Sequence, residues 1–166
     1  GDKRHFSRSY RRRLSAEVLM DAVSDVTGVP EAFSATWPSA RAMETWNFKI
    51  SSEFMDAFGR PNSSSDPPCE RNTKGTVVQS LHLMHAEKLN SKIVHEKGLA
   101  RRLADGEETP LKIAETIYLT ALSRFPTEQE EVVIVAYFEK HKGNRRAAVE
   151  DLLWAVFNSA EFILNH

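Results

Sequence analysis

The chain has little cysteine: Cys69 is the single one among 166 residues. One thiol cannot form an internal disulfide, a multi-cysteine zinc site or the CxxCH attachment of a c-type haem. The net charge is −1 at pH 7, so no overall field attracts nucleic acid or an anionic membrane. The longest apolar run, residues 132–138, is far shorter than the roughly 20 residues that span a bilayer. We therefore expect no nucleic-acid partner, no membrane span and no haem attached to these residues.

Helix-capping residues stand in front of several stretches of helical periodicity. Ser, Thr and Asn side chains accept hydrogen bonds from the first free amides of a helix, and Gly or Pro often follows its end. Short helices are expected at 40–46 and 51–58, a long helix from Lys74 or Thr76 to about Leu89, and a further helix at 91–104 with a break near Gly98. The main predicted helices run from Ser15 to Thr27 before Gly28, from Thr109-Pro110 to Pro126, from Thr127 with Glu130 to Gly143, and from Asn144 to the last residues.

The apolar residues of these helices predict the core. Each set recurs every three or four residues, so its members share one helix face. No alternating strand pair or hairpin signal is visible, and we predict an all-α fold. We expect an irregular or orthogonal bundle of six to eight helices with a long Pro/Ser-rich loop, as one domain over residues 1–166. The predicted buried sets are Leu19, Ala22, Val23 and Val26; Ala114, Ile117, Tyr118, Ala121, Leu122 and Phe125; and Val149, Leu152, Leu153, Val156, Ala160 and Ile163.

A basic N-terminal segment precedes the first predicted helix. Six of the eleven residues 3–13 are Lys or Arg, and Phe6 and Tyr10 lie between them. Basic groups that alternate with aromatics are typical of a polyanion-binding arm. The alternative, which we favour, is a packed segment whose arginines pair with acids elsewhere, because the rest of the chain is slightly acidic.

Polar chemistry is concentrated in residues 58–85, between the predicted helices. Cys69, Glu70 and His82 are the catalytic candidates: a thiolate favoured by the neighbouring Arg71, a general acid or base, and a base for the thiol. The alternative is structural. Arg60 and Arg71 would pair with acids and tie the loop to the bundle, with Cys69 as a small buried residue.

Two histidines lie three residues apart on the helix predicted from residue 74. His82 and His85 can share a face and form one edge of a metal site, but two further ligands would be needed. We therefore predict no metal ion. Gln79 and His85 join Arg60 and Arg71 as the candidate binding residues.

Polar residues also interrupt the C-terminal apolar helices. Arg124 follows an apolar helix, where the helix dipole favours a positive charge. Asn158 and Glu161 either line a polar seam against residues 58–85 or are solvated.

Several segments in order carry a family resemblance. They are RRLSAEVLMDAVSDVTGVP, FGRP with CERN, QSLHLMH, IYLTALSRFPTEQE and EDLLWAVFNSAEFILNH. Together these segments resemble the C-terminal part of the planctomycete-specific domain of unknown function. The chain departs from that family where Pro68-Cys69-Glu70-Arg71 replaces a denser Cys-Glu-Cys-Glu-Arg run, and where His85 replaces a frequent Asn.

The resemblance implies a setting rather than a reaction. In that family the domain lies at the C-terminal end of large exported proteins, after haem-c-type modules. The genes for such proteins are often linked to polysaccharide breakdown. It implies that the chain is a fragment of a larger protein in the periplasm or at the cell surface, and that any haem c lies elsewhere in that protein. The expected partners are other domains of the same chain, with polysaccharide as a second class.

Two functions follow from these observations. The favoured one is a non-catalytic helical scaffold or interaction module. The alternative is part of a glycan-processing hydrolase or lyase, with its site around residues 60–85.

Overall fold

Seven α-helices and one 3-10 helix make up most of the described part of the chain, in a computed structural model that describes residues 12–33, 40–45, 55 and 87–165. The predicted all-α fold is confirmed. The elements are β1 (Arg12–Arg13), α1 (Ala16–Thr27), η1 (Ala42–Glu44), α4 (Glu87–Ile93), α5 (Leu99–Asp105), α6 (Pro110–Leu122), α7 (Glu128–Lys140), α8 (Arg145–Phe157), α9 (Ala160–Ile163) and β2 (Leu164–Asn165).

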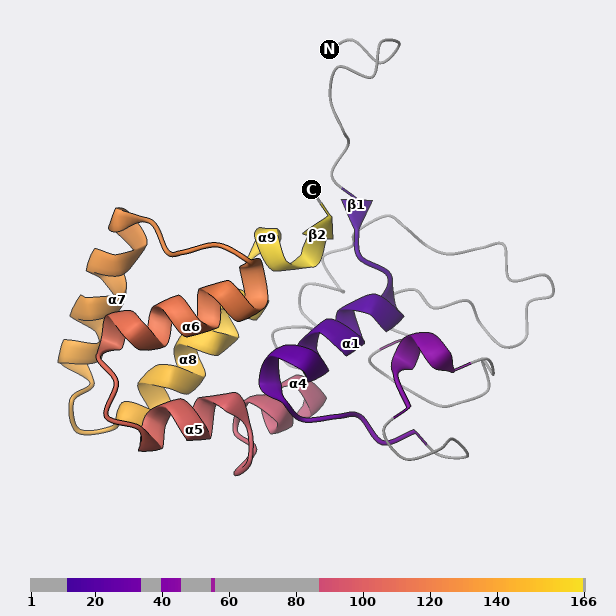
Figure 1. Ribbon diagram of the computed structural model, residues 1–166, viewed down its shortest axis with the longest axis horizontal. Helices are drawn as coiled ribbons and strands as arrows, with labels where there is room; N and C mark the ends of the chain where they lie inside the picture. Colours follow the sequence, from indigo (N-terminus) through magenta and orange to yellow (C-terminus); the bar gives the residue numbers. More distant parts are fainter. Residues whose placement is uncertain (1–11, 34–39, 46–54, 56–86, 166) are drawn as a thin grey trace, which may run out of the picture.

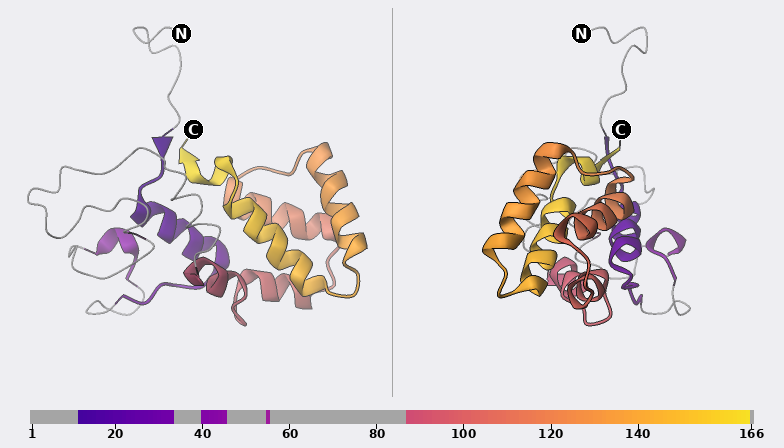
Figure 2. Two further views of the ribbon diagram at one scale, coloured as in Figure 1. Left: turned by 180° about the vertical axis from the view of Figure 1, so that it is seen from behind. Right: turned by 60° about the vertical axis from the view of Figure 1, so that its left-hand side comes forward.

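Helix α8 lies at the centre of the arrangement. It contacts α4, α5, α6, α7 and α9. In Figure 1, α5, α6 and α7 surround it at one end of the molecule, while α1 and η1 lie at the other. Seen from behind in Figure 2, α8 crosses in front of α6, with α7 at the outer edge. None of the helices in the described ranges is both long enough and apolar enough to cross a membrane.

The predicted caps are present. The Ser15 hydroxyl accepts from the amide of Val18, and Gly28 ends α1 in the left-handed region with φ +69°. The side chains of Thr109, Thr127 and Asn144 likewise accept from amides in the first turns of α6, α7 and α8. Local hydrogen-bonding chemistry therefore sets the N-terminal boundaries of these helices.

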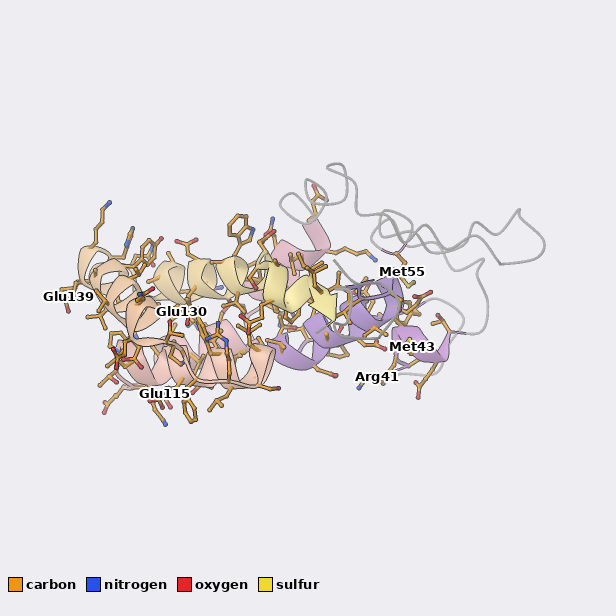
Figure 3. The ribbon with its side chains drawn as sticks, turned by 90° about the horizontal axis from the view of Figure 1, so that it is seen from above. Arg41, Met43, Met55, Glu115, Glu130 and Glu139 are labelled. Carbon is orange, nitrogen blue, oxygen red and sulfur yellow. The ribbon has the colours of Figure 1, made fainter. Side chains whose placement is uncertain are left out.

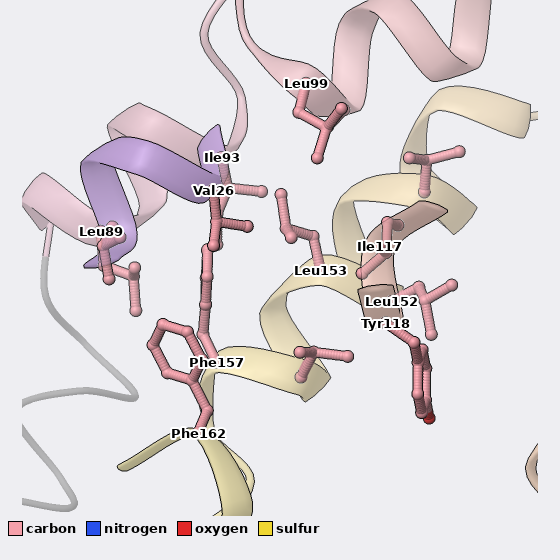
Figure 4. Close-up of a cluster of buried hydrophobic side chains, with 14 of the residues drawn as sticks. Val26, Leu89, Ile93, Leu99, Ile117, Tyr118, Leu152, Leu153, Phe157 and Phe162 are labelled. Atoms are coloured by element: carbon pink, nitrogen blue, oxygen red, sulfur yellow. The ribbon is translucent and has the colours of Figure 1, made fainter. Parts of the chain in front are cut away.

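The core joins all the larger helices. Its fully buried side chains include Leu19 of α1, Ile117 of α6 and Phe157 of α8. The rings of Phe157 and Phe162 pack with centroids 4.8 Å apart and a tilt of 52° (Figure 4). Each such side chain stabilises the fold by about 1.5–3 kcal/mol through removal from water.

Two residues predicted as core are exposed. Phe125 is 61% exposed because Ser123 adopts the left-handed region, φ 56°, and ends α6 before Phe125 can join its buried face. Ala160 is exposed because the helix that contains the preceding residues, α8, ends before it. Ser159 caps a separate helix, α9, by accepting from the amide of Phe162, so the predicted single C-terminal helix is wrong.

Other predicted boundaries differ by a few residues. Helix α4 continues beyond Leu89 to Ile93, α7 ends at Lys140 rather than near Gly143, and η1 is shorter than the helix expected at 40–46. Gly98 and Gly106 flank α5, in agreement with the predicted break and turn. The helix expected at 51–58 lies outside the described residues except for Met55, which is helical.

A short antiparallel pairing closes the described chain. Arg12 pairs with Asn165 and Arg13 with Leu164, and the amide of Leu14 donates to the carbonyl of Ile163 at 3.0 Å. The sequence analysis found no strand pair. A two-residue pairing between segments so far apart in the chain leaves no periodic signal.

Candidate functional site

The catalytic and binding candidates lie outside the described part of the chain, whereas Arg124, Asn158 and Glu161 lie within it. The structure does not describe residues 1–11 of the basic segment or any of residues 56–86. The catalytic and binding candidates therefore stay predictions: Arg60, Cys69, Glu70, Arg71, Gln79, His82 and His85.

Within the described residues, a pocket opens beside the second half of α1. Its volume is about 310 Å³. The wall combines α1, the turn that follows it and the residues before η1, so it has carboxylates, a hydroxyl and a guanidinium. It is lined by Asp21, Ser24, Asp25, Gly28, Pro30, Glu31, Ala40 and Arg41.

The carboxylates on one side of this pocket hold η1 in place. Asp21 Oδ1 accepts from the amide of Ala42 at 2.7 Å, and Oδ2 accepts from Met43 at 3.1 Å. Arg41 donates through both terminal nitrogens to Asp25, at 3.2 and 2.7 Å. The hydrogen bond and charge of Asp25 raise the pKa of Arg41 above its ordinary value. These groups act as a joint between α1 and η1.

A buried lysine stands behind the other side of the pocket. Lys92 of α4 is only 5% exposed, and its Nζ donates to the Val29 carbonyl at 2.7 Å and the Ser24 hydroxyl at 3.3 Å. It also lies 3.2 Å from Glu31, which pairs with Lys88 at 2.8 Å. Burial lowers the pKa of Lys92, and the nearby Glu31 offsets only part of that effect. Burial raises the pKa of Glu31, but the two lysines outweigh it and leave the pKa lowered.

A second polar cluster lies at the other end of the molecule, where α6, α7 and α9 meet. Figure 3 shows Arg41 and Glu130 well separated along the bundle. Arg124 donates from Nη1 and Nη2 to Glu130, both at 2.9 Å, and from Nε and Nη2 to Glu161, at 2.7 and 2.8 Å. Its guanidinium also lies over the Tyr118 ring, 5.2 Å from the centroid. This is favourable cation–π geometry.

The charges of this cluster are strongly coupled. Hydrogen bonds from Arg124 lower the pKa of Glu130 to about 2, against the opposing effect of burial. Thr127 adds its amide at 2.7 Å and its hydroxyl at 2.9 Å to the same carboxylate. Burial raises the pKa of Tyr118, and the charge of Glu130 raises it further.

Every N–H of Arg124 has an acceptor. A guanidinium carries five donors. Four reach the two glutamates, and the fifth reaches the Phe125 carbonyl at 2.9 Å. No donor is left for a ligand, so the arrangement joins the end of α6 to α7 and α9. The sequence analysis found the Thr127–Glu130 capping box but missed this wider network, since Glu161 lies 37 residues from Arg124.

Comparison with known proteins assigns the family. A family model described as PSD1, protein of unknown function (DUF1553), matches residues 1–138. The chain belongs to this family. The matched residues include the pocket, Arg124 and Glu130, whereas α8 and α9 lie beyond the match. No curated protein and no solved structure matches the chain.

Membership confirms the coarser part of the resemblance, a domain of unknown function. The planctomycete origin and the haem-c setting stay predictions. Among the residues that the structure describes, no group of three or more His, Cys, Asp or Glu is arranged to hold a metal ion.

Proposed function

We propose that the chain is a non-catalytic helical interaction module of a larger exported protein, in which it docks against other domains of the same polypeptide. The proposal rests on the hydrogen bonds of Arg124, because all five of its side-chain N–H groups donate to protein oxygens. A guanidinium that binds a substrate or an anion needs donors directed at that ligand. Arg124 instead fixes the relative positions of three elements.

Other basic groups of the described part are used in the same way. Arg145 of α8 donates to the carbonyl of Ala104, in α5, at 3.1 Å and to the carbonyl of Glu108, beyond the end of α5, at 2.6 Å. The ammonium of Lys92 is likewise held by Val29, Ser24 and Glu31. Polar chemistry that ties helices together favours a rigid scaffold over a reactive site.

The proposed setting is an exported protein with haem-c-type modules or a link to polysaccharide utilisation. Its support is the resemblance of segments such as IYLTALSRFPTEQE to the planctomycete-specific domain. The chain would contribute shape and contacts, while chemistry would reside in other modules.

Two measurements on the full-length parent protein and this chain test the proposal. Isothermal titration calorimetry between the chain and the rest of the parent polypeptide should show saturable binding. Release of reducing ends from a panel of polysaccharides by the parent protein should be the same for the wild type and for Glu70→Gln and His82→Ala.

The outcomes separate the two functions. Loss of polysaccharide turnover in either variant, with thermal unfolding unchanged, would support the glycan-processing alternative around residues 60–85. Absence of binding to the rest of the polypeptide would remove the docking role.

A further inference from the structure

The family match ends one helix before the centre of the core. It covers residues 1–138 and stops within α7, whereas α8 begins at Arg145. Helix α8 buries six side chains, against four for α6 and two for α7, so it contributes more to the core than either neighbour. Four of the six are 0% exposed: Ala148, Val149, Leu153 and Phe157. The described core is therefore built around a helix that the family match leaves out.

Helices inside the match pack against α8. Helix α5 packs mainly on α8, with a smaller contact to α1, and α4 contacts both α1 and α8. Figure 4 shows Leu153 of α8 in the same cluster as Leu99 of α5 and Ile117 of α6. A short helix such as α5 is marginal in water by itself and gains its stability from burying an apolar face. The folded state of α5 therefore depends on α8.

The first turn of α8 also supplies hydrogen-bond donors to the matched helices. Arg146 donates from Nη2 to the Val94 carbonyl and from Nη1 to Glu96, both at 2.8 Å. Arg145 donates to the Ala104 carbonyl at 3.1 Å. The last carbonyls of a helix have no intrahelical partner, and Val94 and Ala104 lie at the ends of α4 and α5. These two helix ends therefore take donors from outside the family match.

We propose that α8 belongs to the same cooperative folding unit as α1 and α4–α7, so that the domain to which the family match refers extends in this chain to at least Phe157. On this proposal α8 cannot unfold while the matched helices stay folded. A helix that had been added to a complete domain would instead open on its own, at a lower free energy than global unfolding. This inference does not depend on the proposed docking function.

The test is native-state hydrogen exchange of the whole chain, followed by mass spectrometry of its peptides. In the wild type, the slowest amides of α8 should exchange at the same rate as the slowest amides of α6, because both open only in global unfolding. A rate in α8 that is much faster than in α6 overturns the proposal, since α8 would then open separately.

A substitution in α1 tests the coupling from the matched side. Val23 is 1% exposed and lies in α1, which is not one of the main packing partners of α8. Val23→Ala should speed exchange in α6 and in α8 by the same factor, about tenfold or more. Val94→Ala makes the same change at a residue that is 46% exposed, and it should leave both rates nearly unchanged. Acceleration by Val23→Ala that is confined to the matched helices overturns the proposal.

A substitution in α8 tests the coupling in the other direction. Leu153→Ala removes a buried side chain from α8 and should speed exchange in α1 by the same factor as in α8 itself. Exchange in α1 that stays at the wild-type rate, while α8 exchanges faster, would show that α8 is a separate unit and would overturn the proposal.

Discussion

Replacement of Arg124 by alanine tests the joint between α6, α7 and α9 most directly. The change removes all the donors that Glu130 and Glu161 receive from the guanidinium, and it leaves two carboxylates close together. We expect the free energy of unfolding to fall by about 2 kcal/mol at pH 7.

The magnitude comes from the pKa of Glu130. The difference between 4.5 and about 2 would correspond to roughly 3.4 kcal/mol in a fully shielded group, and the hydrogen bonds from Thr127 supply a part of it that Arg124→Ala keeps. Arg124 and Glu130 are 33% and 32% exposed, so solvent screening reduces this to about 1–2 kcal/mol. Glu161, 36% exposed, adds about 0.5–1 kcal/mol.

The same loss should depend on pH. The pKa of Glu130 is lower in the folded state than in the unfolded chain, so the contribution of Glu130 to the free energy of unfolding is complete above pH 4.5. It is lost as the pH falls from 4.5 towards 2. The difference in stability between wild type and Arg124→Ala should therefore shrink over that interval.

The assay is urea unfolding followed by circular dichroism at a series of pH values. Arg101→Ala is the matched control, because Arg101 makes ion pairs with Glu96 and Asp105 at the surface. It should cost less than about 0.5 kcal/mol. A cost of Arg124→Ala as small as that of the control, or one independent of pH below 4.5, would refute the reasoning.

Two further predictions concern single contacts, each measured by the same unfolding assay. Thr127→Ala removes one half of the capping box of α7 and should cost about 1 kcal/mol, whereas Thr127→Ser keeps the hydroxyl and should cost much less; equal costs would contradict the capping role. Glu31→Gln leaves the buried ammonium of Lys92 with weaker compensation and should cost about 1–3 kcal/mol. Lys92→Met removes the buried charge itself and should cost less than Glu31→Gln, so the reverse ranking would count against this account of the pair.

Local signals were sufficient to predict most of the described helices. The Thr127–Glu130 capping box spans three residues, and Thr109-Pro110 are adjacent, so both motifs can be recognised without tertiary information. The prediction failed at Phe125 because the periodicity of α6 was extended across Ser123, whose left-handed conformation no periodic pattern contains.

The polar joints were not predictable in the same way. Arg124 was assigned only a favourable interaction with the helix dipole, and Glu161 was left as either a seam residue or a solvated one. Their hydrogen bonds depend on the packing of α9 against α6, which the residues near Arg124 do not encode. The candidates Glu70 and His82 rest on sequence alone, because they lie outside the described residues.

The pairing of β1 with β2 has a mechanical consequence. Arg12 lies opposite Asn165, so a force that pulls the chain outward from these two residues loads the pairing at one end. The backbone hydrogen bonds of the pairing then break one after another rather than all at once. The first extension under load would release these strands while the helices keep their hydrogen bonds. The pairing of β1 with β2 therefore opens at a lower force than the helices unfold.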